Sequence, residues 1–176
     1  MQLKPRDLLI GGTAGLGTIF ATPVLAAAPT TMDVTVNIPR LNVAEYHRPY
    51  VAFWVEKAGS PAKTVAVWYD DDMKANEGTK WLRDVRQWWR VSGRAMTFPA
   101  RGISSATRAP GSHRISFTRA QLGVADAGQY TLVVEASREV GGRELLRIPF
   151  TWPAKAGRGG HAQGQNELGL VSVSFR

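Results

Sequence analysis

The residues best suited to chemistry are three hydroxyl side chains, Ser104, Ser105 and Thr107, in a short run of small residues at 102–107. A serine or threonine oxygen can accept a phosphoryl group, and small neighbours leave room for the incoming phosphate. The surrounding stretch, residues 99–112, has no hydrophobic period and is rich in Ala, Gly, Ser, Arg and Pro, which predicts a flexible surface loop. Guanidinium groups that can neutralise a phosphate lie close by in the sequence: Arg101, Arg108 and Arg114.

The string from Gly102 to Thr107 resembles the acceptor motif of covalently flavinylated exported proteins, in which a flavin transferase moves FMN from FAD onto the last hydroxyl. This resemblance implies that Thr107 carries the FMN. It assigns the neighbouring cofactor contacts to Ser104, Ser105, Ala106 and Arg108. Arg101 stands where the motif has aspartate, so modification is inefficient or absent if that acid serves recognition by the transferase. The alternative interpretation is an unmodified surface loop.

No other constellation in the sequence predicts catalysis. The histidines are scattered, have no metal-ligand spacing and are not placed beside a nucleophile: His47, His113 and His161. The run Asp70-Asp71-Asp72 lacks the spaced oxygen ligands and the glycine of a calcium loop, so a solvated turn is favoured over a cation site. We therefore expect no metal site, assign no catalytic residue and find no support for an enzyme.

The composition predicts one exported domain. A chain of 176 residues with 44% hydrophobic content fits a single core, and the absence of cysteine excludes disulfides, iron–sulfur clusters and thiolate zinc sites. Residues 1–26 have the organisation of a signal peptide, with a basic start, a short apolar stretch and small residues at a cleavage site near residues 26–28. We expect a periplasmic domain over residues 29–176, exported by the Sec or the Tat route.

The mature domain is basic. Twenty-two Lys and Arg residues against 14 Asp and Glu give a net charge of +8, and removal of residues 1–26 takes away two bases and one acid, which leaves +7. In an exported protein this charge favours acidic proteins, lipid headgroups or a phosphate-bearing cofactor as partners, and not nucleic acid. The apolar stretch of the leader is short and glycine-rich, so we expect no transmembrane span in the mature chain.

The hydrophobic periodicity predicts an all-β domain. Alternating or continuous apolar runs bounded by turn residues predict strands at 32–38, 50–56, 64–69, 113–118, 130–137, 144–151 and 167–175. Residues 79–90 change to a helical period, with Thr79 as N-cap and Ser92-Gly93 as stop, and the apolar face of this helix consists of Trp81, Leu82, Val85, Trp88 and Trp89. The composition of residues 154–165 predicts a mobile glycine-rich connection. The expected fold is an immunoglobulin-like β-sandwich of about seven to eight strands with one inserted amphipathic helix.

Two aromatic patterns support this fold. The first is the spacing of a tyrosine corner, in which the phenol makes a hydrogen bond to the backbone a few residues earlier in the chain. It is formed by Leu122, Asp126, Gly128 and Tyr130. The alternative is a buried tyrosine after an ordinary turn. The tryptophans of the strands and the helix are expected to form core and not a ligand-stacking surface, with Trp88 or Trp89 as the exception: Trp54, Trp68, Trp81, Trp88 and Trp89.

Several strings along the mature chain form a set: YVAFWVE at 50–56, SATR at 105–108, GQY at 128–130 and EASRE at 135–139. Together they resemble the exported bacterial proteins of domain-of-unknown-function family 2271, over nearly all of the mature chain. Members are typically encoded beside PepSY-type membrane proteins and flavin transferases, which implies a place in extracytoplasmic electron transfer or iron reduction. Members often carry a histidine where this chain has Val140, so a metal or haem ligand at that position would be missing here.

The expected function follows from the motif and the resemblance together. We expect a periplasmic accessory module of a flavin-linked or iron-reducing electron-transfer system, with FMN attached to Thr107. The implied partners are a periplasmic or membrane-bound redox protein and a flavin transferase. The alternative is a non-redox binding or scaffold module with an immunoglobulin-like fold.

Overall fold

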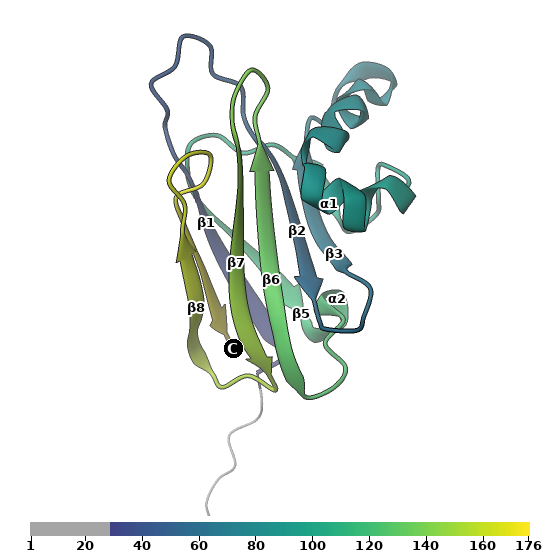
Figure 1. The fold of residues 1–176 in the computed structure, drawn as a ribbon, viewed down its shortest axis with the longest axis vertical. Coiled ribbons are helices and arrows are strands. Elements are labelled where there is room, and N and C mark those ends of the chain that lie inside the picture. The colour runs from purple at the N-terminus through teal and green to yellow at the C-terminus, as the bar shows by residue number, and fades with distance from the viewer. Residues whose placement is uncertain (1–28) are drawn as a thin grey trace, which may run out of the picture.

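The computed structural model describes residues 29–176, which form nine strands in two sheets packed face to face (Figure 1). The order in the four-stranded sheet is β5 (Gly111–Thr118), β1 (Thr31–Ile38), β9 (Leu170–Phe175) and β8 (Gly157–Gln163). The order in the five-stranded sheet is β4 (Ser104–Ala106), β3 (Lys63–Tyr69), β2 (Tyr50–Glu56), β6 (Gly128–Ser137) and β7 (Arg143–Trp152). The predicted β-sandwich is confirmed, and the signal peptide and its cleavage site lie outside the described residues.

The main core lies between the two sheets. Alternate residues of β1, among them Val34 and Val36, point inward and are fully buried, as the period of the sequence predicts. Strand β2 is buried on both faces: Phe53 packs in the main core, whereas Trp54 belongs to a second core on the outer side of its sheet. The continuous apolar run YVAFWVE therefore reflects a strand that is covered from two sides.

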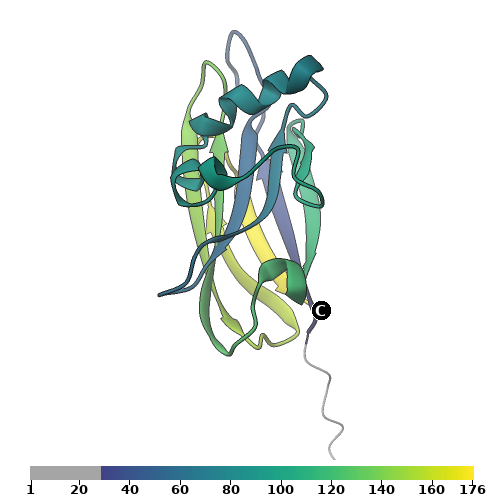
Figure 2. The same cartoon turned by 90° about the vertical axis from the view of Figure 1, so that its right-hand side faces the viewer.

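A helical segment covers that outer face. It consists of the 3₁₀ helix η1 (Lys74–Asp84), the α-helix α1 (Arg86–Val91) and the 3₁₀ turn η2 (Gly93–Ala95), and Figure 2 shows it lying across β2 and β3. Trp88 is completely buried there, and its indole Nε1 donates to Thr64 Oγ1 at 3.0 Å. No helix within residues 29–176 is long and apolar enough to cross a membrane.

The predicted single helix over 79–90 is wrong in form but correct in its buried face. Val85 breaks the helical segment with φ −77° and ψ 71°, because the backbone N–H groups that follow it are bonded to Glu135 of strand β6 and not to the preceding turn. Thr79 is no N-cap: it lies inside η1 and donates to the Asn76 carbonyl. Leu82, Val85 and Trp88 are buried, as the helical spacing predicts.

The tryptophans behave as predicted for core residues. Trp54, Trp68 and Trp88 are at most 1% exposed. Trp81 and Trp89 are partly buried against the second core, so Trp89 is the exception within the adjacent pair.

Two segments predicted as loops contain strands. Residues 104–106 form β4, which pairs in parallel with β3, and residues 157–163 form β8, which pairs with β9. The sequence does not predict these strands, because neither shows alternating apolar and polar residues. Strand β4 is very short, and β8 is a glycine-rich edge strand with the sequence GRGGHAQ. These strands exist through the backbone hydrogen bonds that a neighbouring strand offers, which local sequence does not encode. They bring the strand count above the predicted seven to eight.

A carboxylate on the outer face of the four-stranded sheet holds three neighbouring strands. Asp33 of β1 is 2% exposed and accepts hydrogen bonds from Arg114 and Ser116 of β5 and from Arg176, which follows β9. The Arg176 guanidinium, together with Ser116 and Arg114, outweighs the effect of burial and holds the pKa of this carboxyl well below its ordinary value of 3.8.

The tyrosine corner is confirmed as a hydrogen bond. Tyr130 stands near the start of β6, and its hydroxyl donates to the Asp126 carbonyl at 2.8 Å. The turn before it contains the short helix α2 (Arg119–Leu122), in which Thr118 and Gln121 form a capping box. The corner therefore closes the connection between β5 and β6, which belong to different sheets.

We expect Tyr130→Phe to lower the free energy of unfolding by about 1 kcal/mol, because it removes one hydrogen bond whose acceptor lies at the protein surface and can bind water instead. The measurement is the urea midpoint at unchanged m-value. Tyr46→Phe is the control, since the Tyr46 hydroxyl has no hydrogen-bond partner within the described residues. Equal midpoints for wild type and Tyr130→Phe would contradict the corner.

We expect Asp33→Asn to make the free energy of unfolding less dependent on pH in the acid range. A carboxyl whose pKa is lowered by folding contributes stability that is present above its ordinary pKa of 3.8 and lost as the pH falls below that value. The wild type should therefore lose urea resistance between about pH 5 and pH 2 more steeply than the variant. Asp71→Asn, at an exposed carboxylate with no ion pair within the described residues, should keep the wild-type slope.

Candidate functional site

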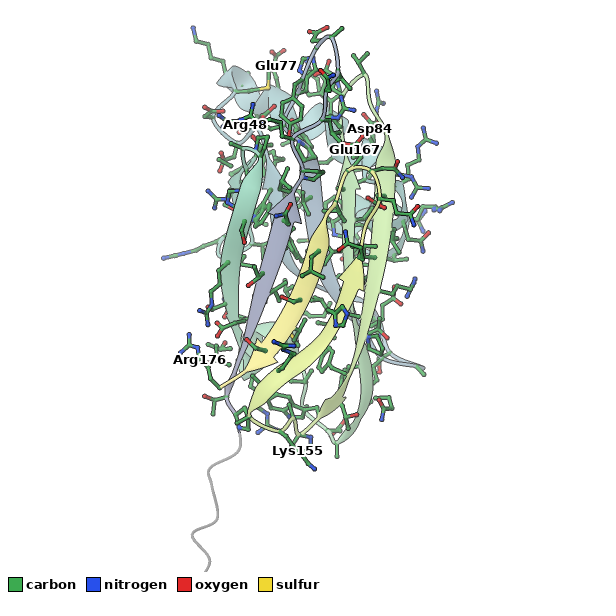
Figure 3. All side chains as sticks on the ribbon, turned by 90° about the vertical axis from the view of Figure 1, so that its left-hand side faces the viewer. Arg48, Glu77, Asp84, Lys155, Glu167 and Arg176 are labelled. Atoms are coloured by element: carbon green, nitrogen blue, oxygen red, sulfur yellow. The ribbon has the colours of Figure 1, made fainter. Side chains whose placement is uncertain are left out.

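A cleft of about 550 Å³ opens at one end of the sandwich. We call it the end cleft. It is bounded by the segment before β2, the segment after β3, the end of β4 and the end of β6, and Figure 3 shows Arg48 and Asp84 at this end. Its lining residues are Tyr46, His47, Arg48, Tyr50, Asp70, Asp72, Met73, Trp81, Asp84, Ala106, Thr107, Ser137 and Glu139. The volume lies within the range of about 300–1,000 Å³ typical of small-molecule sites.

Three side chains of the end cleft are joined by hydrogen bonds. Thr107 Oγ1 donates to Asp70 Oδ1 at 3.0 Å, and the Tyr50 hydroxyl lies 3.4 Å from Asp70 Oδ2. The same Tyr50 hydroxyl donates to the Gly78 carbonyl at 3.1 Å. Gly78 packs so closely that a Cβ there would lie 2.0 Å from the Asp70 carbonyl oxygen. The Asp70 carboxylate is therefore fixed in place, with both of its oxygens facing hydroxyl groups.

The cleft carries more negative than positive charge. Four carboxylates line it, against one arginine and one histidine. Within the described residues, Asp70, Asp72 and Asp84 form no ion pair, whereas His47 lies 3.0 Å from Glu45 and 3.6 Å from Glu139. Burial and the nearby negative charge of Asp70 raise the pKa of Tyr50 above its ordinary value, so this tyrosine stays protonated at neutral pH.

The helical wall of the cleft is held by Glu135. This residue is fully buried in β6, and its carboxylate accepts the backbone N–H groups of Gln87 at 3.0 Å and Trp88 at 2.8 Å. Arg143 of β7 adds a third hydrogen bond at 2.7 Å and supplies the compensating charge. The start of α1 is thereby fixed to the sheet, and the preceding residues that include Trp81 and Asp84 are held over the cleft.

The opposite wall is held by a buried ion pair. Arg138 donates to Glu167 through Nε at 2.9 Å and Nη2 at 3.1 Å, and both side chains are at most 6% exposed. Glu167 also accepts the Gly142 N–H at 2.8 Å, which ties the β6–β7 hairpin to the segment before β9. The Arg138 guanidinium lies over the ring of Tyr46, whose hydroxyl is buried without a hydrogen-bond partner within the described residues.

The structure brings only part of the predicted FMN site to the cleft. Ala106 and Thr107 line it. Ser104 and Ser105 lie in β4, where the Ser104 hydroxyl accepts the Ala100 N–H, and Arg108 lies over the ring of Trp68. The arginines expected near the phosphate are dispersed: Arg114 binds Asp33 on the other sheet, and Arg101 lies exposed in the turn before β4.

The expectation of a flexible, exposed acceptor loop is wrong for Thr107. The residue is 7% exposed, directly follows a strand and is hydrogen-bonded to Asp70. Its surroundings are ordered because β4 pairs with β3 through Ser104, Ser105 and Ala106. Replacing its side chain therefore costs stability, contrary to what a polar loop would predict.

Most of the cleft is not predictable from the sequence. No motif marks Tyr46, Arg48 or Trp81 as a site residue, and the string EASRE, which contains Glu139, indicates the family and not a site. These residues come from segments far apart in the chain. Two signals are available in the sequence. The acceptor motif contains Ala106 and Thr107, which line the cleft, and the aspartate run contains Asp70 and Asp72, which also line it although the pattern of the run favours a solvated turn. No group of His, Asp and Glu within residues 29–176 has the arrangement of a metal site.

Fold and site together define a β-sandwich with a ligand-sized cleft at one end and no metal-binding cluster within the described residues. A family model for "Predicted periplasmic protein (DUF2271)" matches residues 31–170, and the chain belongs to this family. The protein is therefore periplasmic, and the resemblance drawn from the sequence motifs is confirmed. No curated protein and no solved structure matches the chain.

Proposed function

We propose that this periplasmic protein is an accessory module of an extracytoplasmic electron-transfer system that carries FMN on Thr107. The observation that carries the proposal is the position of that hydroxyl: the residue singled out by the acceptor motif lines the end cleft. The cleft has the size of a small-molecule site, and its aromatic residues Tyr46, Tyr50 and Trp81 offer apolar surface to a planar ring. Arg48 lines the same cleft and provides positive charge.

The attachment would be a phosphoryl transfer from FAD, catalysed by a flavin transferase. Thr107 Oγ1 bonds to the phosphorus of the FMN half, the bond from this phosphorus to the bridging oxygen breaks, and AMP leaves. The hydroxyl proton passes to a base. That base belongs to the transferase, because the enzyme reaches Thr107 only when the 3.0 Å hydrogen bond from its hydroxyl to Asp70 is absent.

Two features of the site set requirements for this chemistry. Thr107 is buried, so the transferase must act on the chain before β4 docks or must displace residues 104–111. The product phosphate would lie beside the Asp70 carboxylate, and this repulsion has to be offset by the Arg48 guanidinium. Both requirements favour modification during folding, when Asp70 and Thr107 are not yet paired.

A second candidate, a non-redox binding module, is favoured by the charge of the cleft. Asp70, Asp72 and Asp84 are unpaired within the described residues, although the protein as a whole is basic. Carboxylates beside Trp81 and two tyrosines are the side chains that bind organic cations, through Coulomb attraction and cation–π contact. In this candidate the ligand is a small organic cation that binds without covalent attachment.

We also propose that the sandwich has immunoglobulin-like topology. The order β7-β6-β2-β3 in one sheet is the order of strands G, F, C and C′, and β5 beside β1 in the other sheet matches E beside B. The tyrosine corner near the start of β6 supports the assignment of this strand as F. The four-stranded sheet differs from that of an immunoglobulin domain on one side of β1. There β9 and β8 take the place that strand A has in immunoglobulin domains.

The FMN proposal predicts a covalent adduct. Coexpression with a flavin transferase should add the mass of one FMN phosphoester and a yellow chromophore that survives denaturation. Thr107→Ala should abolish both, Thr107→Ser should retain them because the hydroxyl remains, and Arg101→Asp should raise the modified fraction by restoring the motif. Intact-protein mass spectrometry measures each fraction, and Ser105→Ala is the matched control for a neighbouring hydroxyl. Unmodified mass in wild type and Arg101→Asp alike would remove the proposal.

The second candidate predicts reversible binding of a cationic probe. Calorimetric titration with benzyltrimethylammonium should give a saturable signal, whereas benzyl alcohol, which lacks the charge, should give none. Asp72→Asn should weaken the affinity by roughly threefold, the effect of losing one partly solvated charge. Asp71→Asn is the matched control, because this adjacent aspartate does not line the cleft. Equal affinities in both variants would exclude the end cleft as the cation site.

A further inference from the structure

The end of the sandwich opposite the cleft is basic. Antiparallel pairing gathers there the turn between β2 and β3, the turn between β7 and β8, and the segment that contains α2. Figure 3 shows Lys155 and Arg176 at this end and Arg48 and Glu77 at the other. We call this surface the basic end. Its cationic side chains are Lys57, Lys63, Arg119, Lys155, Arg158 and Arg176.

The acidic residues near the basic end are already paired. Asp126 binds Lys57 at 3.3 Å, Glu56 binds Arg147 at 2.6 Å, and Asp33 binds Arg176 at 2.7 Å. Four exposed cations remain that form no ion pair within residues 29–176: Lys63, Arg119, Lys155 and Arg158. The basic end therefore has a net positive charge available to an external partner, while the unpaired carboxylates Asp70, Asp72 and Asp84 lie in the end cleft.

An apolar cavity adjoins two of these cations. It has a volume of about 390 Å³ and lies between the β7–β8 turn and the end of β9. Its apolar lining includes Phe150, Pro153 and Phe175, and Lys155 and Arg158 stand beside them. A partner that fits both features is amphipathic, with an anionic group for the two cations and hydrocarbon for the cavity.

We propose that the basic end binds the surface of an anionic phospholipid bilayer. The phosphates of neighbouring lipids pair with Lys63, Arg119, Lys155 and Arg158, and the apolar cavity takes the glycerol and upper acyl region of one lipid. A basic surface of this kind is attracted to anionic headgroups, and each cation near the surface contributes to affinity. The end cleft, at the opposite end, then faces away from the bilayer (Figure 3). This proposal does not depend on the ligand of the cleft.

Vesicle sedimentation tests the proposal with the mature chain. The protein should pellet with vesicles of phosphatidylglycerol and phosphatidylcholine, should remain in solution with phosphatidylcholine alone, and should be released by high salt. The double variant Lys155→Glu/Arg158→Glu should lose at least about tenfold in vesicle affinity. The matched control is Lys74→Glu/Arg83→Glu, which makes the same charge change at exposed residues of the helical segment and should keep most of the affinity.

The same variants distinguish lipid binding at the basic end from attraction by the net charge of the whole protein. Equal losses in the two double variants would overturn the proposal, because net charge alone would then account for binding. Failure of the wild type to bind either vesicle would overturn it in favour of an acidic protein partner. Inorganic phosphate at matched ionic strength should not release the protein, and full release would assign the site to free phosphate. The milder Lys155→Gln/Arg158→Gln serves if charge reversal lowers the melting temperature.

Discussion

The rest of the site depends on the hydrogen bonds that the buried Glu135 carboxylate accepts from the start of α1 and from Arg143. A fully buried carboxylate must be hydrogen-bonded and compensated in charge, and Glu135 achieves this by accepting two backbone N–H groups at the start of α1 and the guanidinium of Arg143. The helical segment is thereby fixed across the five-stranded sheet, where Trp88 closes the second core. Without this contact the sheet would expose an apolar face and the cleft would lose a wall.

The two ends of the sandwich differ in charge, and this difference organises the proposed functions. Carboxylates without ion-pair partners within the described residues, such as Asp72 and Asp84, line the end cleft. Cations without such partners, such as Lys155 and Arg158, lie at the basic end. A molecule with this distribution orients itself at an anionic surface, with the basic end toward the bilayer and the cleft toward the periplasm. A redox partner or a soluble ligand would then meet the cleft from the aqueous side.

The sequence predicts the elements whose burial follows a local period. Strands β1, β2 and β3 lie within a residue or so of their predicted bounds, and the spacing of Leu82, Val85 and Trp88 correctly identifies the buried face of the helical segment. The tyrosine corner is equally predictable, because Tyr130 and its acceptor Asp126 are four residues apart. The family match over residues 31–170 agrees with the motifs that suggest it.

The sequence by itself therefore determined the all-β class, the buried faces and the family, since these depend on residue type and short-range spacing. Only the tertiary structure decided that β4 is a strand, that Val85 breaks the helical segment and that Thr107 is buried against Asp70. Each of these depends on a partner more than thirty residues away, such as Glu135 for α1. Local patterns record which face of a segment is apolar, whereas long-range hydrogen bonds select the neighbour that the segment meets.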